Sequence, residues 1–535
     1  MTSIAIAGLP TSRKTPGVYL AVLLGGTPTS AGAAAKKIIV VGNKITTALT
    51  GSAPTFSVAA GTQADASPVF LPSADDAATF FGRGSEPHRM ALGVFAQYPD
   101  ALVYGESVAE SAGSRADATL TFVNAATAAF TIRITLNGKV MEVPVASGDA
   151  IAAISEACAQ AILDEPDLPV TAQFTLGVTA ITAKHTGPRG NDLGIRAQFI
   201  DAAGTPTEIT SSATTSPGAT TAQFGGGAAY GSGYALAGGT TADDFTSALA
   251  AIAGTRYDRI VVACRDTTNL DLVAAQADSM AGVTTQLRQQ FVYGSPATLG
   301  TATTLATGRN DSRGQCVWHY ASPLSAEECA AQVTAARLAG DSLVGGLLVG
   351  EATRPSANLD GCLLRSVPVQ PFVADQPTAT EVESALNNGL TALIPAPSNP
   401  GFCAISRSIT TRSLAGNTPN YSVLDTSNVT VCDYVADDLQ SDLGTVFAGK
   451  NLAADTSDGL PPTAANVVTP SMIRSRIAYK LGTYEENGIV RDVNANLPLL
   501  VVVENLASPG RVDAEIPCEP VPGLHVLGGN LRQVA

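Results

Sequence analysis

The chain has 535 residues, enough for several domains with separate cores. Charged residues make up 14% of it, well below the usual quarter, and the net charge of -15 argues against a nucleic-acid-binding protein. The apolar run Leu497–Val503 is too short to cross a bilayer, so we expect no direct membrane insertion. Met1–Lys14 lacks the pattern of a secretory signal, because Gly8-Leu9-Pro10 interrupts its apolar run, and we expect synthesis in the cytoplasm.

The first 35 residues (1–35) are expected to form an extended N-terminal arm. Within it, Thr15–Val22 contains a short strand-like segment set in polar surroundings. Chain ends are usually disordered unless something ties them down, and a short strand bracketed by Pro and Gly suits pairing with the edge of another sheet. We therefore predict an inter-subunit strand formed by Val18, Tyr19 and Leu20.

Residues 36–109 predict the first part of a central α/β domain. The run Lys36–Gly42 is typical of a buried strand, and Ser73 has the position of a helix N-cap. A second helix is expected at about Pro87–Gln97, before the strand Ala101–Tyr104. Strand, helices and strand in this order indicate an α/β unit.

Residues 110–241 predict an inserted, β-rich outer domain. Strands of alternating character include Ala118–Val123 and Phe130–Leu136, the latter followed by an Asn137-Gly138 turn. One helix is expected at Asp149–Leu163. The last part, Ala202–Thr241, is rich in Gly, Thr, Ser and Ala and predicts a loop-rich exit.

The rest of the body returns to alternating helices and strands. Residues 242–400 predict the second part of the central domain, whose sheet we expect to be mixed, and residues 401–508 predict a C-terminal α/β domain. In that domain a helix is expected at Ser471–Leu481 and a strand at Leu499–Glu504. The predicted fold class is therefore a multidomain α/β and α+β protein with an extended arm at each end.

The C-terminal arm, residues 509–535, keeps the alternation of a strand almost to its last residue. We predict inter-subunit strand positions at Val512, Ala514, Ile516, Leu524 and Val526. The alternative is that both arms fold back on their own domain, since pairing within the chain satisfies a sheet edge equally well.

The chain has eight cysteines, none of them in a CxxC pair. They suit reduced, buried thiols that act as small apolar residues. The other interpretation is that disulfides form after release from the cell, and the best candidate for one is then Cys518, because it lies inside the C-terminal arm.

Motifs for chemistry are missing from the sequence. It has no GxSxG, HExxH, P-loop or EF-hand pattern, and its four histidines have no obvious local partner. The glycine-rich run Gly225–Gly231 follows no clear strand and reads as a linker rather than a phosphate-binding loop. We expect no enzyme activity, no cofactor and no catalytic or metal-binding residue.

A series of short motifs nevertheless runs in order along nearly the whole chain. They are Pro16–Tyr19, Phe80–Ala91, Tyr257–Val261, Arg309-Asn310, Asn388–Thr391, Ser406–Thr411 and Arg511–Pro517. In sequence and order they resemble the motifs of bacteriophage contractile tail sheath proteins, particularly the Mu-like branch. The segment Phe80-Phe81-Gly82-Arg83-Gly84-Ser85, with Met90 after it, resembles the FGxGSxxxxM signature of that family.

The resemblance implies a structural subunit of a phage virion tail, assembled in the host cytoplasm. Such subunits stack as hexameric rings in a helical lattice around a tail tube, and baseplate and tail terminator proteins are the other implied partners. Their arms add strands to neighbouring subunits, the C-terminal domain faces the tube, and contraction drives the tube through the host envelope for genome ejection.

Two rival interpretations remain open at this point. A non-contractile, self-assembling surface protein, of the adhesin or surface-layer type, would suit the Gly/Thr/Ala-rich insertion. An enzyme would follow if the subtilisin-like label sometimes attached to the family core were literal. That requires a Ser, a His and an Asp brought together, for which Ser85 and His319 are the residues to test.

Overall fold

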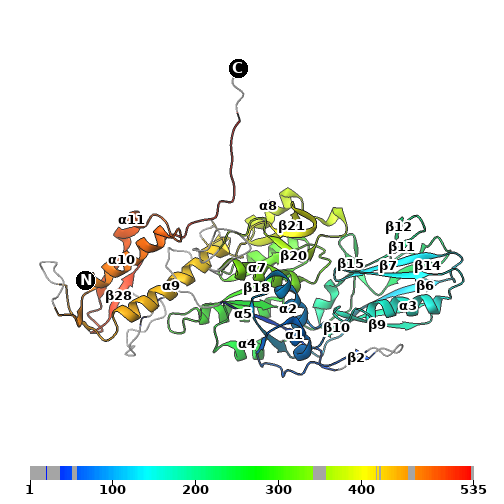
Figure 1. Ribbon diagram of the computed structural model, residues 1–535, viewed down its shortest axis with the longest axis horizontal. Coiled ribbons are helices and arrows are strands. Elements are labelled where there is room, and N and C mark those ends of the chain that lie inside the picture. Colours follow the sequence, from blue (N-terminus) through cyan, green and yellow to red (C-terminus); the bar gives the residue numbers. More distant parts are fainter. Residues whose placement is uncertain are drawn as a thin grey trace, which may run out of the picture.

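The computed structural model describes Val18, Leu20 and residues 36–47, 49–50, 57–341, 357–416, 418–420, 423–455 and 464–531. Figure 1 shows an elongated molecule with a central sheet in the middle, a β-rich domain at one end and a small, mainly helical domain at the other. This mixed, multidomain α/β architecture agrees with the predicted fold class. No helix in the described ranges combines the length and the apolar character needed to span a membrane.

The central sheet has nine strands in the order β20-β22-β21-β19-β18-β17-β1-β5-β4 and is mixed. The run from β5 through β1, β17, β18 and β19 to β21 is parallel, whereas β4 and β22 pair antiparallel with their neighbours. β22 crosses the predicted domain boundary at residue 400 and lies in this sheet. The strands are β1 (Lys37–Asn43), β4 (Val69–Leu71), β5 (Leu102–Val108), β17 (Arg259–Val262), β18 (Gln290–Ser295), β19 (Gly314–Trp318), β20 (Leu363–Pro368), β21 (Leu390–Ala396) and β22 (Asn399–Ile405).

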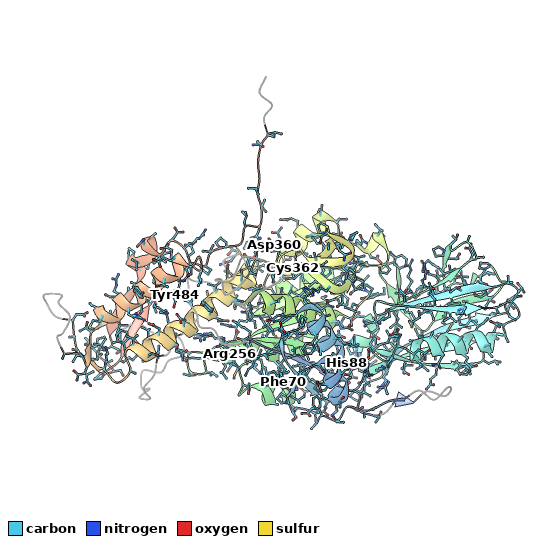
Figure 2. All side chains as sticks on the ribbon, in the orientation of Figure 1. Phe70, His88, Arg256, Asp360, Cys362 and Tyr484 are labelled. Atoms are coloured by element: carbon cyan, nitrogen blue, oxygen red, sulfur yellow. The ribbon has the colours of Figure 1, made fainter. Side chains whose placement is uncertain are left out.

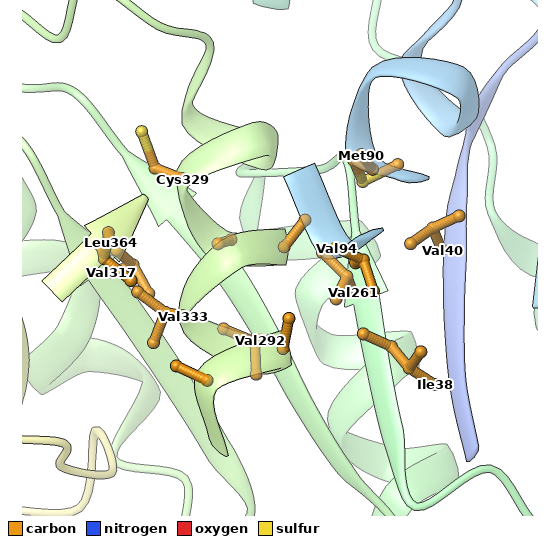
Figure 3. Close-up of a cluster of buried hydrophobic side chains, with 14 of the residues drawn as sticks. Ile38, Val40, Met90, Val94, Val261, Val292, Val317, Cys329, Val333 and Leu364 are labelled. Atoms are coloured by element: carbon orange, nitrogen blue, oxygen red, sulfur yellow. The ribbon is translucent and has the colours of Figure 1, made fainter. Parts of the chain in front are cut away.

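Helices cover both faces of this sheet, which explains why β1 is a continuous apolar run rather than an alternating one. Ile38 and Val40 point into one core, shown in Figure 3, and Ile39 and Val41 point into the other. The first face carries α1 (Ala74–Phe81), α2 (Glu86–Gln97) and α7 (Ala326–Asp341). The second carries α4 (Thr246–Ile252), α5 (Thr267–Met280), α6 (Leu299–Arg309) and α8 (Ala379–Asn387).

Helix α7 is unusual because it is buried almost all the way round although it is not an apolar helix. Its buried residues include Glu327, Glu328, Arg337 and Asp341. The three acids are paired with arginines, Glu327 and Glu328 with Arg89 and Asp341 with Arg259, and buried charges are tolerated when they are paired in this way. Arg337 instead donates hydrogen bonds to the neutral side chains of Gln315, at 2.8 Å, and Gln290.

The inserted domain consists of two sheets, in the orders β13-β14-β6-β10-β9 and β15-β16-β11-β7-β8 with β12 beside β11. Asn137 and Gly138 both have positive φ, as a two-residue hairpin turn between β7 and β8 requires. The prediction of a loop-rich exit at residues 202–241 was incomplete, because five short strands lie there among the loops. Each is two to five residues long and depends on its partner strand, so local composition does not reveal it.

The elements of the inserted domain are as follows. They are β6 (Arg115–Val123), β7 (Phe130–Leu136), β8 (Lys139–Val145), α3 (Ile151–Leu163), β9 (Val170–Thr175), β10 (Val178–Thr186), β11 (Gly194–Ile200), β12 (Pro206–Glu208), β13 (Thr214–Thr215), β14 (Thr221–Gly225), β15 (Ala228–Tyr230) and β16 (Gly233–Ala235).

The C-terminal domain is built on two long helices, α9 (Thr426–Val446) and α10 (Pro470–Glu486), with α11 (Val493–Asn496). Their apolar sides enclose a separate core with Val435, Leu439 and Ile477. Two two-stranded sheets complete it, one of β25 (Asn451–Leu452) and β26 (Val467–Val468), the other of β27 (Val501–Glu504) and β28 (Val512–Glu515). Two further short pairs are β2 (Leu49–Thr50) with β3 (Ser57–Val58) and β23 (Leu414–Ala415) with β24 (Thr418–Pro419).

Candidate functional site

The described residues of the N-terminal arm lie on the chain's own C-terminal core. The side chains of Val18 and Leu20 are half-buried there. The carbonyl of Val18 accepts a 3.2 Å hydrogen bond from Gln286 Nε2, and the carbonyl of Leu20 accepts a 3.1 Å bond from Arg288 Nη2. Tyr19, the third predicted strand position, lies outside the described residues.

The two donors are side chains two residues apart in the sequence, and each bonds one of the two described carbonyls of the arm. Arg288 is fully buried and is held by a 2.5 Å bond to Asp437 of α9, and Gln286 has a left-handed backbone with φ of 57°. Sequence reasoning missed both residues, since their partners are 268 positions away and no local pattern marks them.

The first part of the C-terminal arm is also folded onto its own domain. Strand β28 pairs antiparallel with β27, and Val512 and Ala514 lie opposite Glu504 and Val502. Ala514 and Ile516 pack against the C-terminal core. Within the described residues, β27 and β28 have no other strand neighbour, so each strand presents one unpaired edge.

The second part of the C-terminal arm leaves the body of the molecule, as Figure 1 shows. Leu524 is 75% exposed and Val526 is 83% exposed, and Leu527 and Leu531 are more exposed still. Four large apolar side chains in eight residues are therefore turned to solvent. Such a segment is typical of a surface that another molecule covers.

Cys518 lies at the inner end of this arm and is only 2% exposed. It is a free thiol, as are the other seven cysteines, and all eight are buried. Burial raises the pKa of Cys518 well above the ordinary value of a thiol. The group is therefore protonated at neutral pH and poorly suited to attack by oxidants.

The segment with the FGxGSxxxxM-like motif forms the start of α2. Ser85 caps the helix and accepts a hydrogen bond from the amide of His88, and His88 Nδ1 in turn accepts a 3.0 Å bond from the amide of Gly84. Gly84 has φ of 79°, and a Cβ there would lie 2.3 Å from the carbonyl oxygen of Leu168. The motif residues are thus used in holding a tight turn against the inserted domain.

Buried ion pairs lie beside this contact, and one of them joins the two domains. Arg89 pairs with Glu327 at 3.1 Å and with Glu328, both at the start of α7. Glu86 accepts a 2.7 Å bond from Arg189, which comes from the inserted domain. Burial alone opposes ionisation of Glu327, but Arg89 and Arg265 outweigh it and lower the pKa of Glu327 to about 2.

The histidines offer no support for catalysis. Burial lowers the pKa of His88 to about 4, of His185 to about 3 and of His319 to about 4. His319 lies between two thiols, with Cys329 Sγ 3.8 Å from Nδ1 and Cys403 Sγ 3.5 Å from Nε2. Among the described residues no group of three or more His, Cys, Asp or Glu side chains is arranged to hold a metal ion.

Comparison with known proteins gives a relative that matches almost end to end. No family model matches the chain. The Mu-like prophage FluMu tail sheath protein of Haemophilus influenzae is 22% identical over 517 residues, which are 96% of this chain and 95% of that protein. This relative confirms the resemblance to tail sheath proteins of the Mu-like type that the motifs indicated.

A solved structure also aligns with the chain. The crystal structure of the sheath tail protein of Desulfitobacterium hafniense covers 95% of this chain and 97% of its own, with 13% identity and a TM-score of 0.44.

Proposed function

We propose that this chain, which is similar along almost its whole length to a Mu-like tail sheath protein, is the structural subunit of a contractile phage tail sheath. The observation that carries the proposal is the 96% coverage of the chain by that relative. The role is structural, not enzymatic. Its partners are further copies of itself in stacked hexameric rings, the tail tube, and the baseplate and terminator proteins at the two ends, in a virion tail assembled in the host cytoplasm.

The arms carry the contacts between subunits in this proposal. In the free chain Val18 and Leu20 pack on the core of the C-terminal domain, their carbonyls accept bonds from side chains of the central domain, and β28 pairs with its own β27. The same bonds can be made by the arm of a second copy, because they use main-chain groups that any copy of the arm supplies. The unpaired edges of β27 and β28 and the exposed side chains of Leu524 and Val526 supply further contact.

Such a lattice is stabilised by the large number of strand contacts between subunits rather than by the strength of any single contact. The β27–β28 register joins four residue pairs. A shared strand of this length makes about four hydrogen bonds, each contributing about 0.5–1.5 kcal/mol net. Contraction then converts a kinetically trapped extended lattice into one with more buried contact, and drives the tube through the host envelope.

Negative-stain electron microscopy of the purified chain tests self-assembly. We expect long tubes from the full chain and monomers from a variant lacking Met1–Gly25. Val526→Asp should also prevent tubes, whereas Leu176→Asp, at a residue of the inserted domain that is 75% exposed, is the matched control and should not. Monomers from the full chain, or tubes from the truncated one, would refute an arm-linked lattice.

The same tubes test contraction. Moderate urea should convert extended tubes into shorter and wider ones that keep their rings, because the arms remain linked while the subunits move. Tubes that dissolve directly into monomers would contradict the contractile role and favour a static self-assembling surface protein.

A further inference from the structure

The C-terminal arm makes a second set of contacts that strand pairing does not explain. We infer that, in the free chain, residues 519–525 of the arm form a strap that ties the C-terminal domain to the central domain. His525 is the clasp, the residue that fixes this strap to the central domain. The strap is a property of the folded chain alone and does not depend on a role in a sheath.

One end of the strap is fastened to the C-terminal domain. After β28, the amide of Arg491 donates a 2.8 Å hydrogen bond to the carbonyl of Glu519, and the amide of Val521 donates a 3.1 Å bond to the carbonyl of Ile489. The side chain of Arg491 also pairs with Glu519. Residues up to Val521 therefore belong to this domain.

The other end is fastened to the central domain. His525 Nδ1 lies 2.5 Å from Asp360 Oδ2, in the turn before β20, and His525 Nε2 lies 3.5 Å from Asp425 Oδ2. Figure 2 labels Asp360 near the place where the C-terminal segment leaves the body. A Cβ on Gly523 would lie 3.1 Å from Asn358, so the chain runs close against the central domain just before the clasp.

The exposure of the neighbouring side chains shows that His525 is the residue of this segment whose side chain faces the central domain. Leu524 and Val526 point to solvent, whereas the His525 side chain is 18% exposed. This is the alternation of an extended chain with one face against a surface. Its imidazole lies between two carboxylates and bonds one of them, that of Asp360, through Nδ1.

The position of Asp425 connects the clasp to the start of helix α9. Asp425 is the N-cap residue of α9, the helix that runs from the central domain into the C-terminal domain. Arg407 holds it with two hydrogen bonds of 2.7 and 2.9 Å. The strap therefore closes a loop: α9 leads from this point into the C-terminal domain, and the arm leads back to it.

Hydrogen–deuterium exchange on the full, unassembled chain tests the strap. With His525→Ala, we expect the hydrogen-bonded amide of Val521 and the amides in the first turn of α9 to exchange on the order of tenfold faster, because local opening no longer has to break the clasp. Arg133→Ala, which removes an exposed ion pair with Glu142 in the inserted domain, is the control and should leave these amides unchanged.

A double-mutant cycle distinguishes the loss of the His525–Asp360 contact from an unrelated perturbation of either variant. Asp360→Asn should accelerate the same amides in the parent chain but have little further effect in the His525→Ala background. Exchange that stays at the parent rate in both single variants, or effects that simply add, would overturn the strap. Either result would leave the sheath proposal intact, since tube formation is measured separately.

Discussion

Glu106 gives the sharpest prediction about stability. It lies on β5 with no exposed surface, and neither of its carboxylate oxygens has a hydrogen-bond partner. Tyr104 and Val108, two positions away on either side, contribute to the core beneath α4, and β-strand alternation places Glu106 on that face. Burial raises the pKa of Glu106 from 4.5 to about 8.

The sign of the effect follows from proton binding. The folded chain holds the proton more tightly than the unfolded chain, so the contribution of Glu106 to the free energy of unfolding is most favourable below pH 4.5, falls as the pH rises towards about 8, and then levels off. At pH 7 the loss is about 3 kcal/mol, because each pH unit above the ordinary pKa costs about 1.36 kcal/mol. Glu106→Gln keeps the size but cannot ionise, and should recover most of this at pH 7 and almost none at pH 4.5.

The assay is chemical denaturation followed by the fluorescence of Trp318, the one tryptophan of the chain, which lies in the same core. It reports the central domain specifically, which matters because a multidomain chain need not unfold in one step. A variant that is equally destabilised at both pH values, or a pH profile that keeps the slope of the parent, would refute a buried protonated carboxyl.

Three other expectations follow from the described contacts. Arg89→Met should lower the free energy of unfolding by about 3–5 kcal/mol, because two buried carboxylates lose the arginine that they share. Arg133→Met, at an exposed pair, should cost no more than about 1 kcal/mol, and urea titration measures both. Gly84→Ala should lower the melting temperature through its left-handed backbone and the clash with a carbonyl, while Gly254→Ala, which meets no atom within 4 Å, should change it little. Iodoacetamide should label Cys518 and the other cysteines only slowly in the native chain, as mass spectrometry will show, and rapid labelling at neutral pH would contradict their burial.

Local patterns in the sequence predicted the parts of the fold that local physics decides. The apolar run of β1, the N-cap at Ser73 and the Asn137-Gly138 turn each lie where their residue types indicated. The strands at residues 202–241 could not be predicted in this way, because they are too short to show a period and are stabilised by their partners.

Local sequence patterns predict even less of the candidate functional site. His525 has no partner nearby in the sequence, yet Asp360 and Asp425 flank it in space. Gln286 and Arg288 carry no motif, and their role depends on the carbonyls of an arm at the other end of the chain. The short motifs gave the resemblance, but they do not indicate which side chains hold the arms.

Helix α7 links the inserted domain to the C-terminal domain. At its first turn Glu328 accepts hydrogen bonds from Asn137 of the inserted domain, and at its last residue Asp341 pairs with Arg259, which also bonds Thr430 of α9. Its 16 residues span about 24 Å at 1.5 Å per residue. Because the helix is buried on almost every side and is bonded at both ends, we expect a movement of the inserted domain to be transmitted to the start of the C-terminal domain rather than absorbed between them.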